Sequence, residues 1–287
     1  MPRHVISTAP VDLAQASAIE TAELRAWAEL TAAVPPDHVD RIELHVSRLA
    51  GALVLRCRGG GFHRGLFNRP IGFGVLEPVT RDAVDDLVAG YREAGVDRFI
   101  VPLQPHCRPP ELEGWLVAAG LGPHGAWDRI VRGGEPLQAE PSTAAGRRLE
   151  VSVVDSGSVD AWADFLCDVY HVDAGPWLRA LLDRPGWRHF LAREDGEIVA
   201  ARSRYLPSDG GLVFLAIDGP VPGVMTSDYA PDAALCRAIV EDGLARGANG
   251  FVADVEAPSP SLDTPAYEDF GRLGFTRPYA RIHYALP

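Results

Sequence analysis

Two stretches of the sequence, one in each half of the chain, share one order of elements: strand, helix, strand, short helix, strand. The first runs from Asn68 to Arg132 and the second from Gly211 to Leu286. Their long helices read TRDAVDDLVAGYREAG and PDAALCRAIVEDGLARG, and each ends at a glycine. A repeat on this scale indicates two copies of one structural unit. We therefore expect a mixed α/β fold of two domains, each a mostly antiparallel mixed sheet flanked by helices.

The length of the chain suits this division. Its 287 residues are enough for two domains that each bury a core of their own. A segment rich in Pro, Gly, Ser and Ala, without an apolar period, separates the halves. The expected boundaries are residues 1–132 for the N-terminal domain, 133–148 for the linker and 149–287 for the C-terminal domain.

Composition excludes several classes of function. The net charge of −12 argues against a nucleic-acid surface, which needs clustered cations. The chain has no lysine, so a lysine Schiff base is excluded. The four cysteines form no C-x-x-C pair, and the histidines have no metal-ligand spacing, so no metal site is expected.

The distribution of apolar residues bears on the cellular location. No apolar run reaches about 18 residues, so we expect no membrane span. The N-terminal segment MPRHVISTAPVDLAQ has no apolar signal core. We expect a cytoplasmic protein with reduced thiols.

Two segments of the second half resemble the GNAT superfamily of N-acetyltransferases. RPGWRHFLAREDGEIVAARSRYL (Arg184 to Leu206) resembles its central antiparallel strands, and YEDFGRLGFTRPYARIHY (Tyr267 to Tyr284) its last helix, Gly-Phe turn and final hairpin. The whole chain resembles the tandem GNAT proteins common in high-GC bacteria. The resemblance implies a transferase that moves an acyl group from acetyl-CoA or another acyl-CoA to a small-molecule acceptor. A homodimer is compatible with it.

The CoA-binding motif of this superfamily is degenerate here. Its members hold the CoA pyrophosphate on a Q/R-x-x-G-x-G/A loop at a helix N-terminus, where free N–H groups and glycines let the phosphates approach. Counting back from Gly247 places the loop on residues 227–232, where Pro231 lacks an N–H and Asp228 and Asp232 add negative charge. The equivalent loop of the first half, residues 75–80, has no glycine, and Thr80 would cap the helix that follows.

These substitutions leave two interpretations of the loop. In one, Asp232 caps the helix and its carboxylate replaces the phosphate, so the helix does not hold a pyrophosphate in the usual manner. In the other, the cofactor contacts a different anion nest in the preceding strand end and PVPG turn. The residues expected to bind the cofactor there are Ile217, Gly219, Val221 and Gly223.

Three residues are candidates for catalysis. The superfamily's thiolate-protonating tyrosine corresponds to Phe270, so Tyr267, one helical turn earlier, is expected to replace it; the alternative is a packing aromatic. Asp218, at the end of a strand, is the expected base, or a turn aspartate. His171 is expected to contact the acceptor, or to be a helix C-terminal histidine favoured by the dipole.

Substrate contacts are expected from further polar and aromatic residues. Tyr170 and Asp173 flank His171, and Trp187 lies at the start of a strand. Asn68 and Arg69 are expected to line a cleft between the domains, with a capping role as the alternative.

Three functions remain open from the sequence. The first is a GNAT-fold acyltransferase that uses an acyl-CoA. The second is a repurposed GNAT-fold enzyme of specialised metabolism that does not use CoA, which the altered loops favour. The third is a non-catalytic binding module. The fold alone does not choose among them.

Overall fold

The computed structural model describes residues 6–62, 65–138, 148–256 and 266–287. They divide into two compact units. The C-terminal unit comprises the described residues of Met1–Ala9, Arg129–His171 and Leu178–Pro278. The N-terminal unit comprises those of Pro10–Asp128, Val172–Trp177 and Tyr279–Pro287.

The C-terminal unit is built on a mixed, mostly antiparallel sheet with the strand order β11-β5-β10-β9-β8-β7-β6. The strands are β5 (Gly122–Gly133), β6 (Leu149–Val153), β7 (Trp187–Glu194), β8 (Glu197–Tyr205), β9 (Leu212–Gly219), β10 (Gly250–Glu256) and β11 (Thr276–Ala285). The pairs from β6 to β9 are antiparallel, whereas β9 and β10 are parallel. This confirms the expected mixed α/β class with mostly antiparallel pairing.

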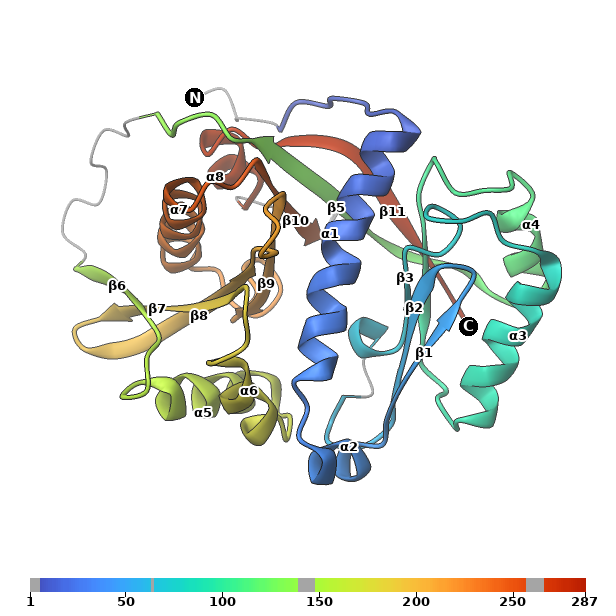
Figure 1. The fold of residues 1–287 in the computed structure, drawn as a ribbon, viewed down its shortest axis with the longest axis horizontal. Helices are drawn as coiled ribbons and strands as arrows, with labels where there is room; N and C mark the ends of the chain where they lie inside the picture. Colours follow the sequence, from blue (N-terminus) through green and yellow to red (C-terminus); the bar gives the residue numbers. More distant parts are fainter. Residues whose placement is uncertain (1–5, 63–64, 139–147, 257–265) are drawn as a thin grey trace. The chain divides into compact units, whose positions relative to one another are not determined.

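Helices cover both faces of this sheet (Figure 1). Helix α7 (Ala230–Ala245) buries Leu235 and Ile239 in one core with Phe190 of β7. On the opposite face, Trp162 of α5 (Val159–Tyr170) lies with its ring centroid 4.2 Å from that of His189. Successive side chains of a strand point to opposite faces, so Phe190 packs on the side of α7 and His189 on the side of α5. Helix α8 (Ala266–Arg272) also belongs to this unit, whereas α6 (Gly175–Leu181) begins in the N-terminal unit and ends in this one.

Strand β9 is interrupted by a β-bulge. Ala201 of β8 pairs with Gly219 and Ser203 pairs with Ala216, so two residues of β9 lie opposite one of β8. Ile217 takes the left-handed conformation there, with φ 48°. The parallel register of β9 with β10 covers only Leu212–Phe214, although both strands continue beyond it. The second half of β9 is therefore bent and separated from β10.

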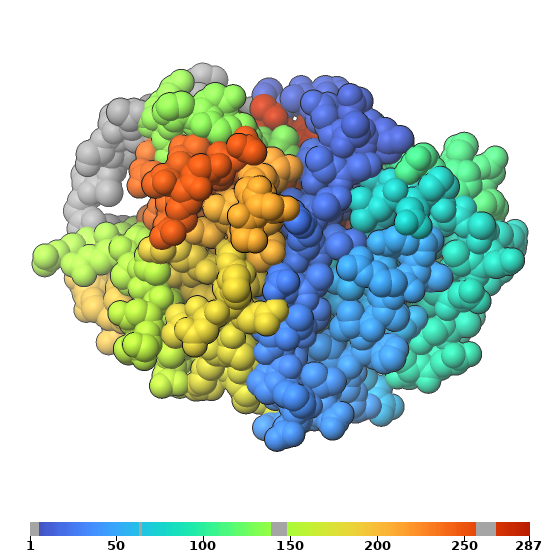
Figure 2. Space-filling view, viewed as in Figure 1, coloured from blue at the N-terminus to red at the C-terminus, as the bar shows by residue number. Residues whose placement is uncertain are grey.

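The N-terminal unit contains the sheet β1-β2-β3 and residues of β4, β11 and β5, the strands at one end of the eight-stranded order. Its further elements are α1 (Leu13–Ala32), α2 (Pro36–Ile42), β1 (Leu44–Leu49), β2 (Ala52–Cys57), β3 (Pro70–Ile71), α3 (Arg81–Glu93), β4 (Ile100–Leu103) and α4 (Leu112–Ala118). Thr80 caps α3 as expected, because its hydroxyl accepts from the Ala83 N–H at 3.2 Å. Residues of α3 form part of the surface in Figure 2.

The two units do not follow the expected boundaries of residues 1–132 and 149–287. Strand β5 comes from the first half of the sequence but lies between β10 and β11 in the strand order. Residues 279–287 of β11 and the C-terminus belong to the N-terminal unit. Strands β5 and β11 each contribute residues to both units, so a boundary drawn at one point of the sequence does not separate the units. Most of the expected linker, residues 139–147, lies outside the described residues.

Among the described residues, no helix is both long enough and apolar enough to be a candidate membrane span.

Candidate functional site

Arg202 of β8 organises the polar centre of the C-terminal unit. Its side chain is 4% exposed. Its Nη2 lies 2.8 Å from Asp218 Oδ2, and its Nε lies 2.9 Å from Asp232 Oδ1. The guanidinium also lies over the ring of Phe270, 5.8 Å from the centroid. One cation is thus shared by two carboxylates, and the group carries a net charge of about −1.

Burial and charge act in opposite directions on these groups. Burial opposes the charged form of Arg202, but Asp232 and Asp218 outweigh it and raise the Arg202 pKa. Burial raises the pKa of Asp232, although Arg202 lowers it in part. Cys236 donates its Sγ–H to Asp232 at 3.7 Å, and burial raises its pKa well above the usual value. Burial therefore disfavours the thiolate, the nucleophilic form of this side chain.

The start of α7 is where the resemblance places the CoA pyrophosphate. The helix begins at Ala230, whose N–H donates to Asp228 Oδ1 at 3.2 Å. Pro231 has no N–H to offer. The N-cap is Tyr229, so a capping role for Asp232 is wrong, and its carboxylate binds Arg202 instead. Two carboxylates of the chain therefore occupy the surroundings of this helix start.

The bulge brings several expected site residues together. Ile217 and Asp218 are the two residues of the bulge. The Tyr170 hydroxyl of α5 donates to the Asp218 carbonyl there. Gly219 packs closely on α5, since a Cβ there would lie 2.9 Å from Leu166 Cδ2. The Asp218 side chain is 32% exposed, so a ligand can reach it.

The turn after β9 uses its own backbone donors. The Gly223 N–H donates to the Thr226 carbonyl, and the Met225 N–H to the Val221 carbonyl, both at 2.8 Å. Gly223 has φ 79°, and a Cβ there would lie 2.9 Å from the Tyr229 hydroxyl. The turn therefore uses the Gly223 N–H and the Val221 carbonyl for its own hydrogen bonds, and this geometry gives no support to a cofactor role for Gly223.

The two polar residues after α5 have local roles. His171 is the C-cap of α5, with φ 54°, and its side chain is exposed. This position matches the helix C-terminal alternative. Asp173 belongs to the N-terminal unit, where its carboxylate lies 2.5 Å from Arg41 Nη2 and its N–H donates to the Gly60 carbonyl.

Asn68 and Arg69 lie inside the N-terminal unit rather than at a surface. Asn68 is 0% exposed and Arg69 is 1% exposed. The Asn68 amide exchanges hydrogen bonds with the Cys57 backbone, at 2.7 and 3.0 Å. Arg69 lies 2.7 Å from Glu23 and over the rings of Trp27 and Trp127. Both side chains hold the unit together, in place of the expected substrate contact.

The last two expected site residues are Tyr267 and Trp187. Tyr267 lies in the first turn of α8, and its side chain is outside the described part of the structure. Trp187 begins β7, and its ring is nearly parallel to that of His189, at an angle of 10°. Trp187 lines a cavity of about 430 Å³ whose lining does not include Asp218 or Asp232. Trp187 is thus placed apart from the expected catalytic residues.

Sequence reasoning missed Arg202, the residue that connects Asp218 with Asp232. A signal was present, because the strand VAARSRY carries arginines at alternate positions among small and apolar residues. Buried arginines are paired almost without exception, so such a strand indicates acidic partners on the element packed against it. Among the described residues, three or more His, Cys, Asp or Glu side chains do not gather at any point in a way that could hold a metal ion.

Comparisons with known proteins identify the fold. No protein-family model matches the sequence, and no curated protein matches it. Solved structures do match. A GCN5-related N-acetyltransferase from Kribbella flavida is 19% identical, with a TM-score of 0.61 over 95% of this chain and 95% of that chain. Another from Sphaerobacter thermophilus is 16% identical, with a TM-score of 0.52 over 99% and 96%. Over nearly its whole length, this chain therefore has the fold of the GNAT N-acetyltransferases.

Proposed function

We propose that this chain is an acyltransferase-like enzyme that transfers an acyl group from an acyl thioester to a small-molecule acceptor. The observation that carries the proposal is the bulged end of β9, bent away from β10, within a GNAT fold. A bulge leaves a residue out of the ladder, and its backbone groups can then bond to the carbonyl of a bound thioester. The accessible carboxylate of Asp218 lies beside that position.

The proposed roles at this site follow from the chemistry of acyl transfer. Asp218 takes the proton from the acceptor nucleophile, which attacks the thioester carbonyl. The C–S bond then breaks, and Tyr267 gives its hydroxyl proton to the departing thiolate. His171 contacts the acceptor, and the backbone of Ile217 faces the acyl carbonyl.

The donor is an acyl-CoA whose pyrophosphate is not held by α7. Asp228 and Asp232 oppose a bound dianion there by about 1 kcal/mol or more each, at an effective dielectric constant near 20. Arg202 offers little compensation, because Asp218 and Asp232 already bind it. The pantetheine arm and acyl group, rather than the nucleotide, would supply the affinity.

The same ion group favours a second candidate. An enzyme of this fold that has lost CoA has no need for free N–H groups at the start of α7. The pairing of Asp232 with Arg202 is compatible with that loss.

The test compares acetyl-CoA with acetyl-pantetheine, which has the same thioester and arm but no nucleotide. Calorimetry and thioester consumption with a panel of small amines are measured for both donors. We expect the two donors to differ by less than threefold in Kd and in kcat/KM. A preference for acetyl-CoA of about 100-fold would show that the nucleotide is held after all. The absence of binding and turnover with both donors would overturn the acyltransferase and leave the second candidate.

The catalytic roles are tested on whichever donor reacts. Tyr267→Phe and Asp218→Asn should each lower kcat by tenfold or more, since general acid–base groups contribute about 10²- to 10⁴-fold. Asp195→Asn is the control, because it removes the same charge in the turn between β7 and β8. Unchanged kcat in both site variants and in His171→Gln would eliminate this site.

A further inference from the structure

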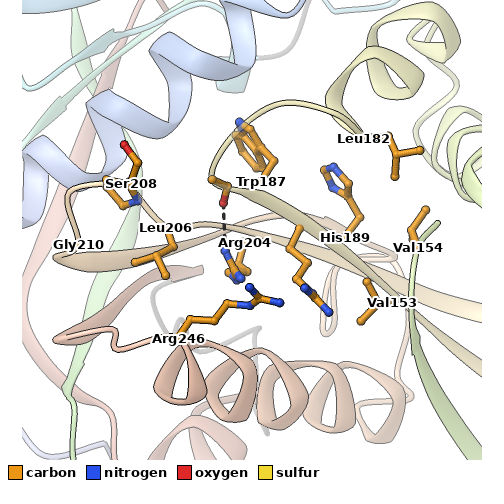
Figure 3. Close-up of a pocket in the computed structure, with 13 residues that line it drawn as sticks. Val153, Val154, Leu182, Trp187, His189, Arg204, Leu206, Ser208, Gly210 and Arg246 are labelled. Carbon is orange, nitrogen blue, oxygen red and sulfur yellow. Dashed lines mark hydrogen bonds between the residues drawn. The ribbon is translucent and has the colours of Figure 1, made fainter. Parts of the chain in front are cut away.

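The cavity beside Trp187 lies in the C-terminal unit at the start of β7 and the end of β8 (Figure 3). Its volume of about 430 Å³ falls in the range of small-molecule sites. Apolar side chains from three segments contribute to its lining, among them Val153, Leu182 and Leu206. The cavity therefore offers an apolar wall to part of a ligand.

The charged side chains of the lining are all cationic. They are Arg188, Arg204 and Arg246. One carboxylate, Asp242 of α7, serves all three, at 3.2 Å from Arg188, 2.6 Å from Arg204 and 3.1 Å from Arg246. Three guanidinium groups and one carboxylate leave a net charge of about +2 at this wall.

The protonation states support this count. Burial alone would raise the pKa of Asp242, but hydrogen bonds and charges from the arginines lower it overall, so it is ionised at neutral pH. Burial lowers the pKa of His189, another lining residue, to about 4, so it is neutral. The positive charge of the wall is therefore not offset by other lining groups.

One feature distinguishes this wall from a closed structural ion network. Arg188 and Arg246 keep 30% and 47% of their side chains exposed, although both are bound to Asp242. A ligand with several acceptor oxygens can therefore reach both guanidinium groups.

We propose that this cavity binds a small organic phosphate monoester, with the phosphate on Arg188 and Arg246 and the organic group against Leu182 and Leu206. The charge of a phosphate monoester, about −1.5 to −2 at pH 7, matches the wall, whereas a carboxylate supplies −1. Guanidinium groups bind phosphate oxygens through paired, charge-assisted hydrogen bonds. The site is separate from the proposed acyl-transfer site, since its lining does not include Ile217, Asp218 or Asp232.

The probe is phenyl phosphate, titrated into the full chain by calorimetry in a phosphate-free buffer. Inorganic phosphate tests the contribution of the ring, and benzoate tests the contribution of the second charge. We expect phenyl phosphate to bind at least tenfold more tightly than either. Acetyl-pantetheine should leave this titration unchanged, because it carries no phosphate and its thioester is expected at another site.

Arg188→Gln and Arg246→Gln should each weaken phenyl phosphate binding by at least tenfold, with the melting temperature unchanged. Arg193→Gln is the matched control, because it removes the same charge from β7 outside the cavity lining. It should change Kd by less than twofold. If Arg188→Gln does not fold, the half-exposed Arg246 carries the test.

Three results would each overturn the proposal. They are no heat of binding with 10 mM phenyl phosphate, equal weakening in the Arg193→Gln control, and displacement of phenyl phosphate by acetyl-pantetheine. None of them depends on turnover, so this proposal and the acyltransferase proposal can fail independently.

Discussion

At the scale of single residues, the C-terminal unit depends on two arginines of β8 and two aspartates of α7. Arg202 binds Asp232 near the start of the helix, and Arg204 binds Asp242 near its end. The arginines lie two residues apart, so both point to the face that α7 covers. A buried ion pair adds little net stability over an apolar pair, but the loss of one partner is expensive.

Arg202→Met should therefore lower the free energy of unfolding by about 3–5 kcal/mol, because Asp232 is left charged and buried. The double variant Arg202→Met/Asp232→Leu should recover much of this loss, since no buried charge remains unpaired. Urea unfolding followed by tryptophan fluorescence measures both. A single-variant loss below about 1 kcal/mol would contradict this account.

His189 makes stability depend on pH. Its folded pKa of about 4 lies below the 6.5 of a free histidine, so at pH between these values the unfolded chain binds a proton that the folded chain does not. Stability should fall by about 3 kcal/mol as the pH drops from 7 to 4. His189→Gln should remove this part of the pH dependence. Parallel pH profiles of the two proteins in urea unfolding would show that His189 does not contribute.

At the scale of elements, a glycine inside a helix can determine how closely that helix packs on its neighbour. Gly243 lies inside α7, where a glycine normally weakens a helix. A Cβ at this position would lie 2.5 Å from the ring of Phe251 in β10, so the glycine permits the close approach of helix and sheet. Gly114 lies inside α4 with nothing within 4 Å of its Cβ position.

These two glycines predict opposite effects of one substitution. Gly114→Ala should stabilise the protein by about 0.5–1 kcal/mol through helix propensity. Gly243→Ala should destabilise it by about 1–3 kcal/mol, because overpacking outweighs the same gain. Thermal unfolding of both variants tests the contrast, and a stabilising Gly243→Ala would show that α7 can move away from β10.

At the scale of the whole molecule, the fold depends on two strands that serve both units. Residues of β5 and of β11 occur in the C-terminal and in the N-terminal unit. β11 pairs antiparallel with β4, with Ile282 opposite Leu103, and its Tyr284 is 3% exposed in the core of the N-terminal unit. The two halves of the sequence are therefore not independent in structure.

This dependence predicts how fragments behave. Residues 149–287, the expected C-terminal domain, lack β5, the strand between β10 and β11. This fragment should show no cooperative melting, whereas residues 122–287 should melt cooperatively because β5 is restored. Circular dichroism and the dispersion of amide NMR signals measure the difference. A well-dispersed spectrum for residues 149–287 would instead support the division drawn from the sequence.

Much of the fold could be predicted from the sequence, because local patterns determine it. The repeated order of elements indicated α3 and α7, Thr80 indicated the start of α3, and the segment with the Gly-Phe turn indicated the GNAT fold. The altered loop at residues 227–232 likewise showed that the start of α7 is acidic. Each of these signals depends on residues close together in the sequence.

The site could be predicted only in part, because partners distant in sequence decide it. Asp232 was recognised, but its partner Arg202 lies in another element, and a helix cap was the only local partner to consider. The burial of Asn68 and Arg69, and the cationic cavity of β7, β8 and α7, arise only when the strands pair. Strand order depends on long-range pairing, which leaves no periodic trace in the chain, so only the tertiary structure could place β5 between β10 and β11.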